Sequence, residues 1–211
     1  LTPTVRPEAA QAIWTIAEAL RGAGLLGEAA SYDEKLVDKY PKDVHARDAG
    51  FNAVIARVAL GQYDQAVKDA DLYLKLYSTA SPDDADEVTF LLGQAHEKAK
   101  KWNEAAKIYA NYVARAKNVD HKIEAYVRLA QVKLETKDGK AADSALEQAV
   151  KLGKSKGKAL KEGRVHAAHA RYLQGERLVA EYDAITLDAS GGELKKRLAK
   201  KTELLKKAGS T

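Results

Sequence analysis

Three side chains between residues 162 and 169 have the spacing of a metal-binding set. Glu162, His166 and His169 follow one another at i, i+4 and i+7, so in a helix they share one face. Carboxylate and imidazole groups are ligands that zinc accepts. Two histidines on a polar helix surface are nevertheless more typical of solvent-exposed side chains, and the chain contains no HExxH pattern. We therefore predict no metal site and no cofactor.

Other catalytic chemistry has less support in the sequence. The chain has no cysteine, which excludes thiol catalysis, disulfides and zinc–thiolate sites. It also lacks a glycine-rich phosphate loop and a nucleophile elbow. Carboxylates are plentiful, but no spacing isolates an acid–base pair. The sequence predicts a protein that is not an enzyme.

A basic segment at residues 193–208 contains seven Lys or Arg and two Glu. Its net charge of +5 equals that of the whole chain. Basic helices can contact anionic lipid, so peripheral membrane contact through this segment is one possible role. The segment has no interleaved aromatic residues, so it carries no specific signal for nucleic-acid binding. Leu194, Leu198 and Leu205 give the segment an apolar side, which favours a capping helix with a solvated basic face. The candidate basic patch is Lys195, Lys196, Arg197, Lys200 and Lys201.

Helices must position these side chains, because apolar residues recur at spacings of three and four along most of the sequence. The composition is 45% hydrophobic and 31% charged, which is typical of a soluble folded protein. No apolar run approaches the roughly 20 residues that span a bilayer, and no signal peptide is visible. The sequence predicts an all-α protein.

An alanine recurs at a nearly constant interval in these helices. Ala29, Ala66, Ala105, Ala142 and Ala180 are separated by 37, 39, 37 and 38 residues. Within residues 86–113, Leu92-Gly93 is followed by Ala105 and then by aromatic Tyr109, with a short break between two amphipathic stretches. This pattern resembles the helical hairpin of the tetratricopeptide repeat (TPR) family, whose usual period is about 34 residues. The longer period resembles TPR variants found in several bacterial envelope proteins.

The resemblance, which covers roughly residues 9–188, implies a right-handed α–α superhelix of about five hairpins. We expect a leader at residues 1–6, a solenoid at 7–188 and a capping helix at 193–208. Residues 151–158 are rich in glycine and lysine and are expected to form a loop. The expected hairpins are 7–41, 44–77, 82–117, 120–152 and 159–188.

In TPR proteins the first helix of each hairpin lines the concave face, so the resemblance also implies a candidate binding surface. The apolar candidates on this face are Trp14, Phe51, Ile55, Phe90, Val127 and Val165. Acids precede several of them by three residues, with Gln11 in the first hairpin, and would select positive charge. These acids are Asp48, Glu87, Glu124 and Glu162. The alternatives are that the apolar side chains pack between hairpins and that the acids only complement the helix dipole.

These features predict a non-catalytic scaffold that binds a partner protein or peptide, such as a basic amphipathic segment, on the concave face. The alternative is a cell-envelope or membrane-associated structural module that uses its basic C-terminal helix, with the groove filled by its own chain. The sequence leaves the compartment open, because a fragment of a bacterial cell-envelope protein and a cytoplasmic protein both fit it.

Overall fold

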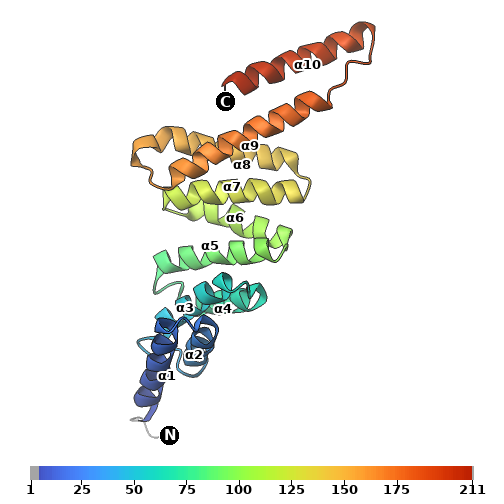
Figure 1. The fold of residues 1–211 in the computed structure, drawn as a ribbon. Coiled ribbons are helices and arrows are strands. Elements are labelled where there is room, and N and C mark those ends of the chain that lie inside the picture. Colours follow the sequence, from blue (N-terminus) through green and yellow to red (C-terminus); the bar gives the residue numbers. More distant parts are fainter. Residues whose placement is uncertain (1–4, 211) are drawn as a thin grey trace. The chain divides into compact units, whose positions relative to one another are not determined.

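The computed structural model describes residues 5–210, and all the regular secondary structure within them is helical, with ten α-helices and one short 3-10 turn. Residues 1–4 of the expected leader lie outside the described residues, and Val5 and Arg6 already belong to the first helix. Figure 1 shows the helices in chain order. Their bounds are α1 Val5–Gly22, α2 Leu26–Lys39, α3 Ala46–Ala59, α4 Tyr63–Tyr77, α5 Pro82–Lys98, α6 Trp102–Arg115, α7 Val119–Glu135, α8 Gly139–Lys156, the 3-10 turn Gly157–Ala159, α9 Gly163–Ala184 and α10 Gly191–Ser210.

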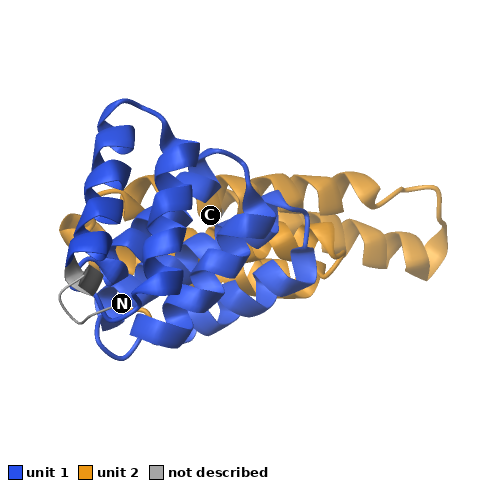
Figure 2. Cartoon of the chain, turned by 90° about the horizontal axis from the view of Figure 1, so that it is seen from below, with its two compact units in different colours: residues 1–115 blue, residues 116–211 orange. Residues whose placement is uncertain are grey.

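The chain divides into two compact units, residues 1–115 and 116–211, which Figure 2 shows in different colours. We call them unit 1 and unit 2. Unit 1 contains the pairs α1–α2, α3–α4 and α5–α6, and unit 2 contains α7 to α10. In both units, consecutive helices pack against each other through their apolar faces.

Four hairpin turns have the same backbone geometry. Each contains one residue with a positive φ, namely Gly24, Gly61, Lys100 or Lys137. The amide of the following residue bonds back to a carbonyl five residues earlier, as in Lys101 N to His96 O at 2.8 Å. This hydrogen bond is the Schellman ending of a helix. Each positive-φ residue lies five positions before one of the first four repeat alanines, so the repeat fixes the turn as well as the packing.

Behind each turn, the repeat alanine is buried in the second helix of the hairpin. Ala29, Ala66, Ala105 and Ala142 are at most 1% exposed. In the third hairpin, Gly93 of α5 lies against Tyr109 of α6, and a Cβ on Gly93 would approach the Tyr109 ring to 2.6 Å. The absence of a side chain at Gly93 therefore makes room for the buried tyrosine.

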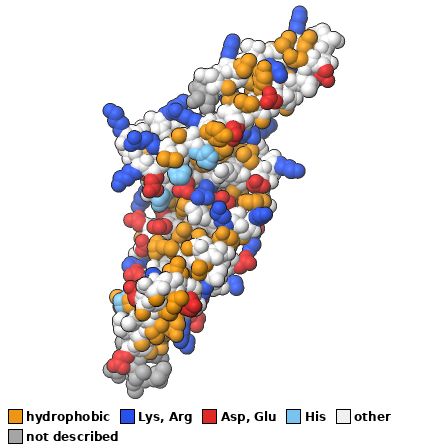
Figure 3. All heavy atoms as spheres, viewed as in Figure 1, with side chains coloured by type: hydrophobic (Ala, Val, Ile, Leu, Met, Phe, Trp, Pro, Cys, Tyr) orange, Lys and Arg blue, Asp and Glu red, His pale blue; other side chains and the backbone are white. Residues whose placement is uncertain are grey.

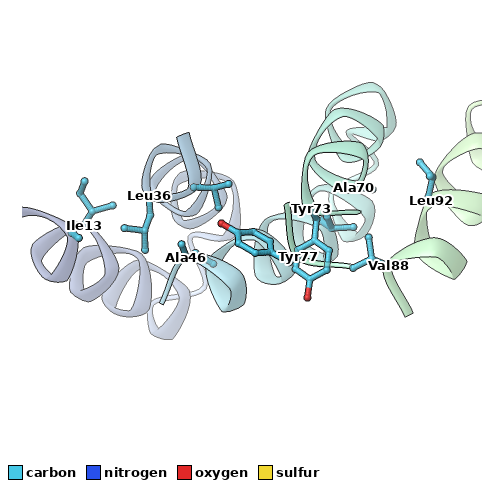
Figure 4. Close-up of a cluster of buried hydrophobic side chains, with 12 residues drawn as sticks. Ile13, Leu36, Ala46, Ala70, Tyr73, Tyr77, Val88 and Leu92 are labelled. Carbon is cyan, nitrogen blue, oxygen red and sulfur yellow. The ribbon is translucent and has the colours of Figure 1, made fainter. Parts of the chain in front are cut away.

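The core of unit 1 runs continuously through its first five helices. Figure 4 shows buried Ile13, Leu36, Tyr73, Tyr77 and Val88, contributed by α1, α2, α4 and α5. The Tyr77 hydroxyl donates to the Pro41 carbonyl at 3.0 Å, which satisfies the polar end of an otherwise apolar side chain. Such a shared core is expected of stacked hairpins, because one hairpin cannot bury its apolar face alone.

Unit 2 departs from the expected repeat. Residues 159–188 do not form a fifth hairpin: α9 continues through Gly175, and Ala180 is exposed rather than buried. One glycine costs a helix about 1 kcal/mol, and the strong helix formers around Gly175 outweigh that cost. The chain reverses at residues 185–190, so α10 follows α9 as the second helix of a pair (Figure 1). The expected loop at 151–158 is mostly helical, because α8 extends to Lys156.

A side chain from the first hairpin of unit 2 also fixes the start of α9. Asp120 Oδ1 accepts hydrogen bonds from the amides of Lys161, at 3.0 Å, and Gly163, at 2.7 Å. The cap of α7 itself is Asn118, whose side chain accepts from Asp120 N and His121 N. Asp120 thus links two helices that are more than 40 residues apart in the sequence.

Candidate functional site: a partner-binding face on unit 1

Three of the predicted site residues share one face of α3. Asp48, Phe51 and Ile55 follow one another at spacings of three and four, so they lie on successive turns. Asp48 is exposed, Phe51 is half-buried against the unit 1 core, and Ile55 is 40% exposed. The centroid of the Phe51 ring lies 6.2 Å from the centroid of the buried Tyr73 ring. Its inner edge is therefore anchored in the core while its outer edge stays accessible.

Trp14 of α1 extends this face toward the N-terminus. Its ring stacks on His45, with the ring centroids 4.8 Å apart and the planes nearly parallel. The His45 Nε2 lies 3.2 Å from the side-chain oxygen of Gln11. His45 is not among the predicted site residues, although it lies one helical turn before Asp48 and its spacing could have identified it.

The start of α5 adds negative charge beside α3. Asp83, Asp84, Asp86 and Glu87 lie in its first two turns. The Arg47 guanidinium donates to Asp48 at 2.9 Å and lies 4.0 Å from Asp84. The hydrogen bond to Asp48 raises the pKa of Arg47 above its usual value. Because one arginine is shared between two carboxylates, this region keeps an excess of negative charge.

Tyr73 lies beneath this acidic region as a neutral group. Burial, followed by the nearby charge of Asp84, raises the pKa of the Tyr73 hydroxyl to about 12. The hydroxyl therefore stays protonated at ordinary pH, and the negative charge of the face comes from carboxylates alone.

Two predicted contact residues lie in the core instead of at the surface. Phe90 is 6% exposed and packs 5.4 Å from Tyr112 and 6.0 Å from Tyr109, measured between ring centroids. Val127 is 2% exposed. Because they are buried, both residues contribute to helix packing and present almost no surface to a partner. They have the same repeat position as Phe51, but the neighbouring helices cover them.

In unit 2 the corresponding acids are placed differently. Glu124 is half-buried, accepts from Arg128 at 2.8 Å and lies 3.5 Å from His166 of α9. Glu162 and His169 are exposed, as is Val165 at 70%. Within residues 5–210, no group of three His, Asp or Glu side chains is arranged to hold a metal ion. His166 is thus brought to Glu124 rather than into a cluster with Glu162 and His169.

The basic patch is partly engaged in holding α10. Arg197 donates to Asp188 at 2.7 Å and to the Thr186 carbonyl at 3.1 Å, which fixes the loop before α10. The Lys201 ammonium lies 4.0 Å from the centroid of the Tyr182 ring, and Lys200 lies 3.4 Å from Glu181. Lys195 and Lys196 are exposed. No helix in the described part of the chain has the length and apolar character needed to cross a membrane.

These placements define one surface on which apolar and acidic groups occur together. We call it the first-helix face of unit 1, comprising Trp14, Asp48, Phe51, Ile55 and Glu87. Figure 3 shows apolar side chains at the surface in patches bordered by charged ones. Accessible aromatic and aliphatic groups beside carboxylates suit a ligand that carries both apolar and cationic side chains.

Comparisons with known proteins agree with the TPR resemblance. The family model described as tetratricopeptide repeat matches residues 87–118, the segment around Gly93, Ala105 and Tyr109. No curated protein sequence matches the chain. The match to one repeat and the fold of the structural neighbours together support a TPR-type helical-repeat protein.

Solved structures with TPR-like folds resemble the whole chain or most of it. BtubC (BKLC) from P. vanneervenii is 15% identical, with a TM-score of 0.58 over 99% of this chain and 82% of that one. A kinesin-light-chain-like protein from Podospora anserina with nearly identical TPR-like repeats is 16% identical to this chain. The TM-score is 0.56, over 97% of this chain and 99% of that one. MamA from Desulfovibrio magneticus RS-1 is 16% identical, with a TM-score of 0.54 over 69% and 76%. At these identities the similarity shows the fold: an all-α, TPR-like solenoid.

Proposed function

Because this chain has the TPR-like fold of helical-repeat scaffold proteins, we propose that it is a non-catalytic scaffold whose first-helix face of unit 1 binds a basic amphipathic helix. TPR-like folds generally hold protein partners, which supports the scaffold role in general terms. The single observation that carries the specific proposal is the side-by-side placement of Asp48, Phe51 and Ile55 on α3.

The proposed ligand follows from the chemistry of the face. An amphipathic helix docks by placing apolar side chains, spaced by three and four residues, against an apolar surface. Phe51 and Ile55 offer that surface, and Trp14 extends it. Asp48 and Glu87 then favour lysine or arginine on the borders of the helix, because opposite charges across an interface select the partner and speed association.

The proposal is tested with two variants that change similar surface area. Ile55 on α3 is 40% exposed and Leu72 on α4 is 39% exposed. A lysine at either position should therefore disturb the core only slightly and to a similar extent. The probe is a fluorescein-labelled synthetic peptide of leucine and lysine, with leucines at spacings of three and four. Binding is measured by fluorescence anisotropy with the full chain.

We expect Ile55→Lys to weaken peptide binding by about tenfold or more, since it removes an apolar contact and adds a repulsive charge. Leu72→Lys should bind as the unaltered chain does. Equal effects of the two variants, with the helicity of both preserved, would show that the peptide does not bind at the first-helix face.

A further inference from the structure

The two units carry opposite net charge. Residues 1–115 contain 14 Lys or Arg and 17 Asp or Glu, for a net charge of −3. Residues 116–211 contain 21 Lys or Arg and 13 Asp or Glu, for a net charge of +8. The segment 193–208, within α10, contributes +5 of this charge. The protein therefore contains both an acidic unit and a basic helix.

The exposed side of α10 has the properties of the ligand proposed above. Leu198 is 45% exposed and Leu205 is 59% exposed, and their spacing of seven residues places them two turns apart on one side. Lys195 and Lys206 are exposed beside them. This stripe is amphipathic and basic, and the described contacts within unit 2 leave it at the surface.

A different side of α10 holds the helix in place. Leu204 is 3% exposed, and Arg197 and Lys201 contact the end of α9 and the following loop. Leu198 and Leu205 are offset from these residues around the helix. The helix can thus stay attached to α9 while its exposed stripe contacts another surface.

We propose that the exposed stripe of α10 (Lys195, Leu198, Leu205 and Lys206) binds the first-helix face of unit 1 in a second copy of the chain. This inference rests on the proposed function and names the partner. Apolar groups on both surfaces meet, and lysines of α10 oppose Asp48 and Glu87.

The dimensions of the two surfaces are compatible. A helix of 20 residues, the length of α10, spans about 30 Å. Helices that pack against each other lie about 10 Å apart, and α3 and α5 contact each other in unit 1. One α10 is long enough to cross both. Each copy supplies one face and one helix, so reciprocal binding of the two copies would make an isologous dimer.

The experiment exchanges charges between the two surfaces and measures mass by sedimentation velocity in low salt. The face variant carries Asp48→Lys and Glu87→Lys, and the helix variant carries Lys195→Glu and Lys206→Glu. All four side chains are exposed, so the fold should be retained, and circular dichroism checks this. We expect the unaltered chain to dimerise and each variant alone to be monomeric.

An equimolar mixture of the two variants should dimerise again, because each altered surface then meets its opposite charge. Raising the salt concentration should dissociate the unaltered dimer, since these exposed charges are screened. A monomeric unaltered chain at all concentrations, or dimers that persist in both variants, would overturn the proposal. So would a monomer that binds phosphatidylserine vesicles through Lys195 and Lys206.

The leucine–lysine peptide separates this proposal from the one on which it rests. If the peptide binds the unaltered chain and not the face variant, while the chain stays monomeric, only the identity of the partner is overturned. If the peptide binds neither protein, the binding function of the first-helix face fails as well.

Discussion

The acid near the start of a first helix is placed differently in α3 and α5 of unit 1 and in α7 of unit 2. In unit 1, Asp48 and Glu87 remain exposed beside apolar side chains. In unit 2, Glu124 contacts Arg128 and His166 and so helps to join α7 to α9. The residue at this repeat position is therefore exposed in α3 and α5, whereas in α7 it forms an internal contact. A periodic position alone does not determine which role its residue takes.

Both units combine close packing at small residues with polar contacts between helices. In unit 1, Gly93 leaves room for Tyr109, and Arg57 of α3 donates to Glu34 of α2 at 2.6 Å. In unit 2, Gly153 of α8 lies against Ala167 of α9, and Asp120 accepts from the amides at the start of α9. A variant that removes one of these contacts should affect the unit that contains it most.

The largest effect is expected from Gly93→Ala in unit 1. The added Cβ would lie 2.6 Å from the Tyr109 ring, which is itself buried and cannot move freely. Overpacking of this kind typically lowers the free energy of unfolding by about 1–3 kcal/mol, and we expect about 2 kcal/mol from urea denaturation.

The matched control is Gly175→Ala in unit 2. Gly175 is also within a helix, but nothing lies within 4 Å of a Cβ there. This substitution should raise the free energy of unfolding by about 1 kcal/mol, the difference in helix propensity. A destabilised Gly175→Ala variant would contradict the continuous α9.

The next effect is expected from Asp120→Ala, which removes both hydrogen bonds to the start of α9. Loss of a capping carboxylate lowers the free energy of unfolding by about 1–2 kcal/mol. Hydrogen exchange should become faster in the first turn of α9, whereas α3 and α5 of unit 1 should be unchanged. Asp120→Asn keeps an acceptor oxygen, so it should lower the free energy of unfolding by less than Asp120→Ala does.

A smaller effect is expected from pH, and it should be located in unit 1. Burial raises the pKa of Asp33 to about 6, and burial together with the charge of Glu34 raises the pKa of Asp69 to about 7. Both groups bind a proton more readily in the folded than in the unfolded chain. The free energy of unfolding should therefore fall as the pH rises from about 4 to about 7.

Because Asp69 is only partly buried, solvent screening limits its contribution to about 1 kcal/mol. Denaturation at pH 5.5 and 8.0 measures the change, and Asp69→Asn should reduce it. Hydrogen exchange should show the difference in α2 and α4. A stability that rises over this range would contradict the assignment.

The smallest effect is expected at the hairpin turns. Lys100 in unit 1 and Lys137 in unit 2 have φ values of 59° and 60°, a conformation that glycine adopts more readily. Lys100→Gly and Lys137→Gly should each raise the free energy of unfolding by about 0.5–1 kcal/mol, which a higher melting temperature would show. Gly61→Ala, at the equivalent turn, should lower the free energy of unfolding by a similar amount. A loss in both lysine variants would show that these turns are not strained.

Much of the fold could be predicted because its signals are local. The helical spacing, the alanine period and the glycines at 24 and 61 lie within single hairpins. Lys100 and Lys137 occupy the same backbone conformation without a residue type that signals it. Gly175 shows the opposite problem, because a glycine that suggests a turn lies in the middle of a helix whose neighbours favour continuation.

The candidate site was harder to predict because burial depends on distant residues. Phe51 and Phe90 occupy one repeat position, yet Phe90 is covered by Tyr109 and Tyr112. Similarly, Asp120 lies in the first turn of α7, whereas its carboxylate accepts from the amides at the start of α9. Contacts between helices far apart in the sequence decide both cases.

The most direct test of the partner-binding face is photo-crosslinking from two positions of equal exposure. Benzoylphenylalanine is placed at Ile55 in one protein and at Leu72 in another, and each is irradiated with the labelled leucine–lysine peptide. We predict an adduct from position 55 that disappears in the Asp48→Lys, Glu87→Lys background, and little adduct from position 72. Equal adducts from both positions, unaffected by the charge reversal, would contradict a binding site on the first-helix face of unit 1.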